Sequence, residues 1–196
     1  MSHSKNDIRY IKTDRSIQNS FWTLMNKKGF SHMSVQDIIK ESMINRSTFY
    51  DHYKDKYDLL DQLENTMIDE MHCIMLNNIE AIKLTHAVPD EDLHIYLKQM
   101  LQYFYENATH FSLLMIENEN TTFQKKLQQS TQQIWKEADI LKELIIPPQY
   151  ATVAVSSVIS TMIIEWIKSG FKENIEEFTA IMHSVTNMFL KNMIGN

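Results

Sequence analysis

The chain has 196 residues, of which only three are Gly and three are Pro. This pair makes up about 3% of the chain against roughly 12% in ordinary proteins, which excludes a turn-rich β-sandwich or barrel. The glycines, at positions 29, 170 and 195, are too far apart to build the glycine loops of a Rossmann fold, a P-loop or a hydrolase nucleophile elbow.

The formal net charge of −6 is unevenly distributed along the chain. Residues 1–60 hold ten Lys/Arg and seven Asp/Glu, whereas the remaining residues hold nine Lys/Arg and eighteen Asp/Glu. A basic first third beside an acidic remainder indicates that the two parts have different partners. An excess of positive charge is typical of a segment that meets a polyanion such as nucleic acid.

The composition, 43% hydrophobic and 22% charged, is that of a soluble globular protein. The apolar run from Ala151 to Ile164 is shorter than the ~20 residues that a bilayer span needs, and the N-terminus lacks the apolar centre of a secretory signal. We therefore expect a cytoplasmic protein with no membrane partner. Its one cysteine, Cys73, has no intramolecular disulfide partner. We also expect no enzyme activity, no cofactor and no metal.

Helical periodicity predicts an all-α fold of about nine helices. The predicted helices span about 7–28, 34–41, 45–53, 55–85, 93–104, 111–116, 123–144, 150–169 and 174–194. Gly29 is placed as a C-terminal stop for the first helix, Ser34 and Asp37 form a capping box for the second, and Asn45 suits the N-cap of the third. The helix over 150–169 is apolar on every face, which predicts burial on all sides.

Two short helices, 34–41 and 45–53, are separated by about three residues and preceded by a longer helix, which is the arrangement of a helix-turn-helix. The second would be the reading helix, with Phe49 and Tyr53 packed inward. Its other side chains carry hydrogen-bond donors suited to a DNA groove: Arg46, Ser47, Thr48, Tyr50 and His52. A three-helix unit with no nucleic-acid role has the same apolar spacing, so spacing alone leaves both interpretations open.

The residues from Gly29 to Leu60, GFSHMSVQDIIKESMINRSTFYDHYKDKYDLL, resemble the DNA-binding domain of the TetR family of bacterial repressors. The resemblance covers about residues 8–65 and rests on Gly-Phe, Ser-Val-x-Asp-Ile-Ile, Asn-Arg-Ser-Thr-Phe-Tyr-x-His-Tyr and Lys-x-Lys-x-x-Leu-Leu. The rest of the chain is similar to that family only in being helical and of the right length. The resemblance implies a DNA-binding domain over 1–54 and a larger effector-binding and dimerisation domain over 55–196, connected by the helix from about 55 to 85.

The resemblance also implies roles for individual side chains. Arg46, Ser47 and Thr48 would read base edges, while Tyr50, His52, Lys56 and Ser34 would hold phosphates. Phe49, Tyr53, Ile38 and Leu60 would form the core. For each polar residue the alternative is a solvated surface group. Met43 departs from the family, in which many members have Gly at this turn; if the turn needs a left-handed backbone, Met costs about 1 kcal/mol there.

The acidic part contains ample material for an effector pocket. The candidate lining residues for a small apolar or amphipathic effector are Phe104, Phe111, Met115, Trp135, Met162 and Trp166. The alternative for each is plain core, because apolar residues fill both. Glu165, next to Trp166, is either a buried polar anchor or an exposed residue at a helix end.

A single reading helix buries too little surface for selective binding, so two copies related by a two-fold axis are expected about one helical turn of DNA apart, ~34 Å, or a multiple of that distance. The helix from Ala151 to Ile164, in which Ala154, Ser156, Ser157 and Ser160 permit close approach, would pair with the last helix in an intersubunit four-helix bundle. The alternative is that this helix forms the centre of a monomeric core.

We therefore expect a transcriptional repressor that binds a palindromic operator as a homodimer and is released by a small-molecule effector. The alternative is a helical adaptor or co-regulator that acts through protein contacts without an effector.

Overall fold

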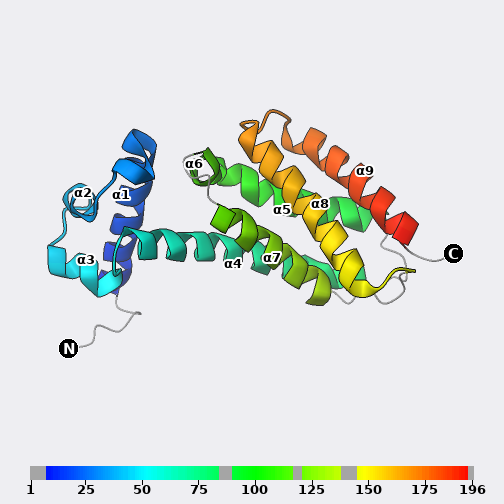
Figure 1. The fold of residues 1–196 in the computed structure, drawn as a ribbon, viewed down its shortest axis with the longest axis horizontal. Helices are drawn as coiled ribbons and strands as arrows, with labels where there is room; N and C mark the ends of the chain where they lie inside the picture. Colours follow the sequence, from blue (N-terminus) through cyan, green and yellow to red (C-terminus); the bar gives the residue numbers. More distant parts are fainter. Residues whose placement is uncertain (1–7, 84–89, 117–120, 138–144, 194–196) are drawn as a thin grey trace. The chain divides into compact units, whose positions relative to one another are not determined.

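The computed structural model describes residues 8–83, 90–116, 121–137 and 145–193, and within these ranges it contains nine α-helices and no strand. This confirms the predicted all-α fold and the number of helices. The helices, labelled in Figure 1, are α1 (Ile8–His32), α2 (Val35–Glu41), α3 (Arg46–His52), α4 (Lys56–Lys83), α5 (Asp90–Glu106), α6 (Ala108–Ile116), α7 (Thr121–Glu137), α8 (Pro148–Lys168) and α9 (Ile175–Met193).

The chain divides into two compact units, Met1–Thr66 and Met67–Asn196, and the division falls inside α4. The first unit contains α1, α2, α3 and the beginning of α4. The second contains the rest of α4 and the helices from α5 to α9.

In the first unit, α2 and α3 lie on the same side of α1 (Figure 1). The regular part of α1 stops at Gly29, as predicted, because this residue has φ 79° and ψ 159°, a conformation that glycine adopts without steric cost. Ile17, Phe21 and Met25 line its buried side, and Ile38 of α2 and Phe49 of α3 are fully buried in the same unit. These apolar side chains form the small core that supports α3.

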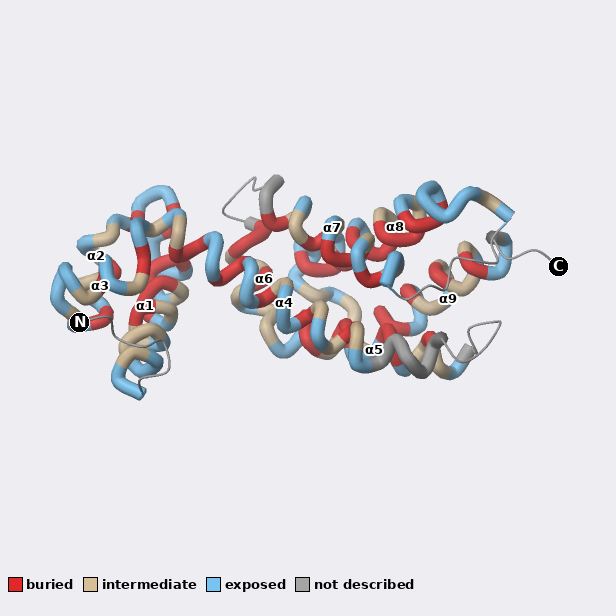
Figure 2. The backbone as a smooth tube through the Cα atoms, turned by 90° about the horizontal axis from the view of Figure 1, so that it is seen from below, coloured by how far each residue is buried: buried red, intermediate tan, exposed pale blue. Residues whose placement is uncertain are grey.

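In the second unit, α5 packs against α9, and α8 packs against α6, α7 and α9. Figure 2 marks in red the buried residues of α7 and α8, where the two helices lie next to each other. Among the described residues, α8 is long and apolar enough to cross a membrane by composition, but half of that stretch is buried inside the unit. Ala151, Val155, Ile159 and Ile163 form its buried side, so α8 has the position of a core helix.

Two predictions about these helices need correction. The break between α5 and α6 lies at Asn107 and not after His110, because the Asn107 side chain donates to the Tyr103 carbonyl and its own carbonyl accepts from the Phe111 amide. The helix predicted over 150–169 is not buried on all sides in the single chain. Tyr150, Val153 and Thr161 of α8 are exposed.

The end of the helix predicted over 123–144 falls partly on residues 138–144, which lie outside the described part of the chain.

Candidate functional site

Helix α3, the predicted reading helix, has one buried and one exposed side. Phe49 is completely buried and is the only residue of α3 classed as buried, while Arg46, Ser47 and Tyr50 are exposed and Thr48 is half-buried. Tyr53, just past the helix, is buried with its ring 6.0 Å from that of Phe49. The predicted inward and outward positions of this helix are therefore confirmed for Phe49, Tyr53, Arg46, Ser47 and Tyr50.

Two of the exposed side chains hold each other in place. The Arg46 guanidinium donates a hydrogen bond to the Tyr50 hydroxyl at 3.3 Å, and its carbon lies 5.4 Å from the centre of the Tyr50 ring. The two residues are one helical turn apart, which brings such pairs onto the same face. The guanidinium, which is well suited to bidentate hydrogen bonds, thus starts from a supported position on the outer side of α3.

The turn between α2 and α3 has the left-handed backbone that the family pattern suggests. Met43 has φ 55° and its side chain is 93% exposed. The backbone amides of Ser42, Met43 and Ile44 still bond to the last carbonyls of α2, so the turn is closed despite the missing glycine. The cost of about 1 kcal/mol for a side chain at this position follows from its φ.

The caps of the two short helices differ from each other. Ser34 forms the predicted capping box with Asp37, because each side chain contacts the backbone amide of the other residue. Asn45 is the N-cap of α3 by its extended backbone, but its side chain makes no capping hydrogen bond. The predicted N-cap position of Asn45 is therefore confirmed, while the side-chain hydrogen bond that such a cap usually makes is not formed.

The Ser34 hydroxyl, predicted to meet a phosphate, donates to the Asp37 carboxylate at 2.6 Å. The ammonium of Lys28 also lies 2.7 Å from Asp37 Oδ2. The hydrogen bonds from Lys28 and Ser34 hold the pKa of Asp37 far below its ordinary value of 3.8. A phosphate at Ser34 would lie next to this carboxylate.

Lys56 joins the beginning of α4 to the end of α1. Its ammonium donates to the backbone carbonyls of Phe30 at 2.9 Å and Met33 at 2.8 Å, and it lies 4.5 Å from the centre of the Phe30 ring. These contacts satisfy carbonyls at a helix end, where positive charge is favourable. In this structure Lys56 is therefore part of the framework under the reading helix.

His52 is packed against α1. Its side chain is 3% exposed, its ring stacks on Tyr10 with 3.8 Å between centroids, and its Nδ1 lies 3.1 Å from Asp14 Oδ1. This position differs from that of an exposed phosphate clamp. Its burial points to a role in holding the end of α3.

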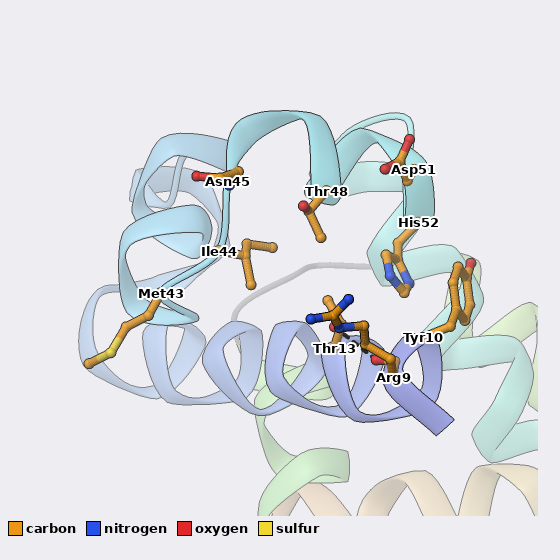
Figure 3. Close-up of a pocket in the computed structure, with 9 residues that line it drawn as sticks. All are labelled: Arg9, Tyr10, Thr13, Met43, Ile44, Asn45, Thr48, Asp51 and His52. Atoms are coloured by element: carbon orange, nitrogen blue, oxygen red, sulfur yellow. Dashed lines mark hydrogen bonds between the residues drawn. The ribbon is translucent and has the colours of Figure 1, made fainter. Parts of the chain in front are cut away.

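A groove of about 450 Å³ lies between the first half of α1 and α3 (Figure 3). Arg9 and Thr13 project from α1 toward Thr48 of α3, and His52 closes one end next to Tyr10. The other lining residues are Met43, Ile44, Asn45 and Asp51. The groove therefore follows the inner edge of the reading helix.

Two family models match this chain. A TetR C-terminal model, described as "Transcriptional regulator C-terminal region", matches residues 91–188, and a model described as "Bacterial regulatory proteins, tetR family" matches residues 22–63. The chain belongs to the TetR family. The first match covers half of the chain and the second contains the whole helix-turn-helix.

The chain is also similar to individual regulators. The uncharacterized HTH-type transcriptional regulator YxbF of Bacillus subtilis (strain 168) is 38% identical over 55 residues, which are 28% of this chain and only 14% of that relative's length. A TetR transcriptional regulator from Streptococcus agalactiae 2603V is 21% identical with a TM-score of 0.66, covering 92% of this chain and 96% of that one.

A second solved structure is FadR from Bacillus subtilis in complex with stearoyl-CoA. It is 17% identical with a TM-score of 0.61, covering 91% of this chain and 98% of that one. At these identities the solved structures show the TetR fold alone, with its N-terminal helix-turn-helix and C-terminal helical domain.

The residues predicted to line an effector pocket lie in the interior of the second unit. Phe104, Phe111, Met115 and Trp166 are buried and Met162 is half-buried, while the side chain of Trp135 lies outside the described part of the structure. Phe104 and Phe111 pack with 4.6 Å between ring centroids. The structure brings these two together with Tyr103 and Phe123 in one aromatic cluster.

Trp166 belongs to a different aromatic group. It stacks on Phe178 with 4.3 Å between centroids, and its indole nitrogen donates to the Glu173 carbonyl at 3.0 Å. Glu165 next to it is exposed, so the alternative of a buried polar anchor is excluded. Trp166 thus fastens α8 to α9 and to the loop between them.

Sequence reasoning missed the α1 side of the reading unit. Tyr10, Asp14 and Gln18 follow each other at intervals of four residues and so lie on one face of α1, where they meet His52 and Tyr53. The spacing is a signal that was available in the sequence. It was not informative without knowing which helix this polar face meets.

Proposed function

We propose that this chain is a DNA-binding transcriptional repressor that binds a palindromic operator as a homodimer through α3 and is released by a small-molecule effector. The observation that carries the proposal is the exposed row of donors on α3, Arg46, Ser47 and Tyr50, on a helix held from behind by Phe49. Membership in a family of bacterial regulatory proteins supports it. A duplex partner also implies a cytoplasmic protein.

Within the proposed interface, Arg46 is the main base-reading residue. A bidentate contact from arginine to guanine in the major groove contributes about 1–3 kcal/mol of discrimination against the wrong base. Ser47 and Thr48 lie on the same turn of α3 and add shorter contacts, while Tyr50 supports Arg46 and reaches a phosphate. His52 and Lys56 act behind this surface by holding α3 and the end of α1 in place.

The homodimer is supported by the uncovered faces of α8 and α9. Tyr150 and Val153 of α8, and Ile181 and Met188 of α9, are large apolar residues that the single chain leaves exposed. Of the small residues predicted to allow close approach, Ser156 and Ser160 are instead buried in the chain's own core, where they bond to backbone carbonyls. Ala154 is half-buried and is left for the contact, whereas the half-buried Ser157 accepts a hydrogen bond from Gln128 of α7 at 3.1 Å.

The effector, under this proposal, is a small apolar or amphipathic molecule taken up by the second unit. The relative solved with stearoyl-CoA has the same fold, and Phe104 and Phe111 belong to an aromatic cluster in the interior of this unit. An effector that prefers the form unable to bind DNA must weaken operator binding by the same factor by which the operator weakens effector binding.

The proposal is tested by selecting duplexes from a random-sequence pool with the full-length protein. We expect an inverted repeat with half-sites about one helical turn apart, ~34 Å, and an affinity that falls steeply with salt, by a log–log slope of about 0.9 per phosphate contact. Selection of no preferred sequence, together with weak and salt-independent binding, would instead favour the adaptor.

The dimer has a separate test. Val153→Asp places a charge on the uncovered face of α8, and we expect the mass in ultracentrifugation to fall from twice 23.2 kDa to 23.2 kDa and operator affinity to fall at least ~100-fold. Ile95→Asp is the matched control, because Ile95 on α5 is 48% exposed where Val153 is 51% exposed. A wild-type mass of 23.2 kDa at micromolar concentration would contradict the dimer.

A further inference from the structure

Asp14 of α1 connects α1 to the end of α3. Its Oδ1 accepts a hydrogen bond from the Tyr53 hydroxyl at 2.6 Å and lies 3.1 Å from His52 Nδ1, while its Oδ2 accepts from the Gln18 amide at 2.9 Å. Since Oδ1 is an acceptor, Nδ1 is assigned as the protonated nitrogen of His52. The Gln18 amide also donates to the Tyr53 hydroxyl at 3.2 Å. Two residues far along the chain thus converge on one carboxylate.

These contacts restrain the rotation of α3 about its own axis, which the apolar core leaves partly open. Phe49 anchors α3 by packing, which is non-directional, whereas hydrogen bonds to a carboxylate depend on direction as well as distance. The His52 ring, stacked on Tyr10, and the buried Tyr53 ring together hold the C-terminal end of α3 at a set rotation. Burial of Phe49 determines which side of α3 faces inward, and the polar contacts restrain the rotation of the helix more narrowly.

Rotation of α3 matters for base reading. A side chain extends about 6 Å from the axis of a helix, so a rotation of about 30° moves its end by roughly 3 Å. A bidentate contact between Arg46 and a base tolerates only a few tenths of an ångström, because hydrogen bonds weaken outside about 2.7–3.2 Å. Phosphate contacts made by long flexible side chains tolerate more.

We propose that Asp14 is a positioning residue for sequence recognition, which sets the rotation of α3 through His52 and Tyr53 and thereby the ability of Arg46 to distinguish bases. This inference rests on the proposed function, because it concerns how that function is made selective. On charge alone, a carboxylate in this unit weakens binding to a polyanion. Removing the negative charge of Asp14 should therefore strengthen operator binding, whereas removing its positioning role should weaken it.

The test uses the full-length protein and two duplexes of equal length, the inverted repeat selected by the wild type and an unrelated sequence. We expect Asp14→Asn to lower the ratio of the two affinities about 10-fold, because its amide nitrogen cannot accept a hydrogen bond. In place of Oδ1 it loses the bonds from Tyr53 and His52, and in place of Oδ2 it loses the bond from Gln18. Binding to the unrelated duplex should stay equal or become tighter. A purely structural role would reduce the folded fraction and weaken both duplexes alike.

Asp69→Asn is the control for charge. Asp69 lies on the exposed side of α4 in the second unit, and the substitution makes the same change in charge. We expect this variant to leave the affinity ratio unchanged.

Tyr53→Phe is the second variant and removes only the hydroxyl that bonds to Asp14. It should lower the ratio about 5-fold alone but less than 2-fold in the Asp14→Asn background, because both changes break one network. A wild type that prefers no duplex would reject the proposed function itself. Two results with a selective wild type would overturn the role of Asp14. In one, both variants retain the affinity ratio; in the other, they lose it only in parallel with nonspecific binding.

Discussion

The two units of this molecule differ in where their characteristic side chains lie. In the first unit, Arg46 and Tyr50 are held on the outside of α3, while in the second Phe104 and Trp166 face inward among other aromatic rings. The polar groups on the outside of this supported helix are not used by the core, which leaves them available to a partner. Aromatic residues in an interior serve packing and ligand binding equally well, so their identity does not separate the two.

The largest expected effect is the loss of stability on removing one large core side chain from each unit. Trp166→Ala should destabilise the second unit by about 3–5 kcal/mol, because it removes the stacking on Phe178 and leaves a cavity. Phe49→Ala should have an effect of similar size on the first unit. Hydrogen exchange measures both, with protection lost in α8 and α9 for the first variant and in α1 to α3 for the second.

Trp166→Phe serves as the matched control, because it retains an aromatic ring against Phe178 and should recover most of the stability. If Trp166 were chiefly a ligand wall, Trp166→Ala would leave the protection of α8 and α9 unchanged and affect only the response to an effector.

The next effect concerns the outer side of α3. Arg46→Ala should reduce discrimination at one base pair in each half-site by about 1–3 kcal/mol. Tyr50→Phe should reduce discrimination at that same base pair by less, because it removes the hydroxyl that accepts from Arg46 but retains the ring below the guanidinium. Affinities for the selected duplex and its single-base variants provide the measurement. If Tyr50→Phe reduced discrimination at a different base pair, Tyr50 would not act through Arg46.

A smaller effect is expected at the turn. Met43→Gly should stabilise the first unit by about 0.5–1 kcal/mol, since φ 55° costs less for glycine than for a residue with a side chain. Urea denaturation gives the change in midpoint. Met43→Ala keeps the backbone cost while removing the exposed side chain, so equal stabilisation by Ala and Gly would attribute the effect to the side chain and not to φ.

The smallest effect concerns acid stability of the first unit. Lys28 and Ser34 lower the pKa of Asp37 in the folded protein below its ordinary value of 3.8. The stabilisation is therefore present above about pH 4 and is lost as the pH falls below that value. We expect Asp37→Asn to lower the melting temperature at pH 6 and to show a smaller further loss between pH 5 and pH 2 than the wild type. Parallel melting curves over this range would contradict the role of Asp37.

Much of the fold was predictable because local signals determine it. Helical periodicity, Gly29 as a stop and the Ser34–Asp37 capping box all act within a few residues of one another, and the structure contains each of them. The break at Asn107 was misplaced because it depends on one side chain bonding to a carbonyl four residues before it. Such a bond competes with continuation of the helix, and the sequence pattern alone does not decide the outcome.

The candidate site was predictable only on its exposed side. Arg46, Ser47 and Tyr50 were recognisable by residue type and by the family pattern, whereas His52 and Lys56 carry equally polar groups that turn inward. Their partners are Asp14 on a distant part of the chain and two backbone carbonyls. These partners are set by the tertiary arrangement of the first unit.

The central claim, that α3 lies in the major groove of a duplex, is tested most directly by methylation interference at guanine N7, an atom exposed only in that groove. With the selected inverted repeat, methylation should block the wild type at one guanine in each half-site, at positions about one helical turn apart, and Arg46→Ala should lose sensitivity at that guanine. Wild-type binding unaffected by N7 methylation, or equal interference in the wild type and Arg46→Ala, would contradict the account.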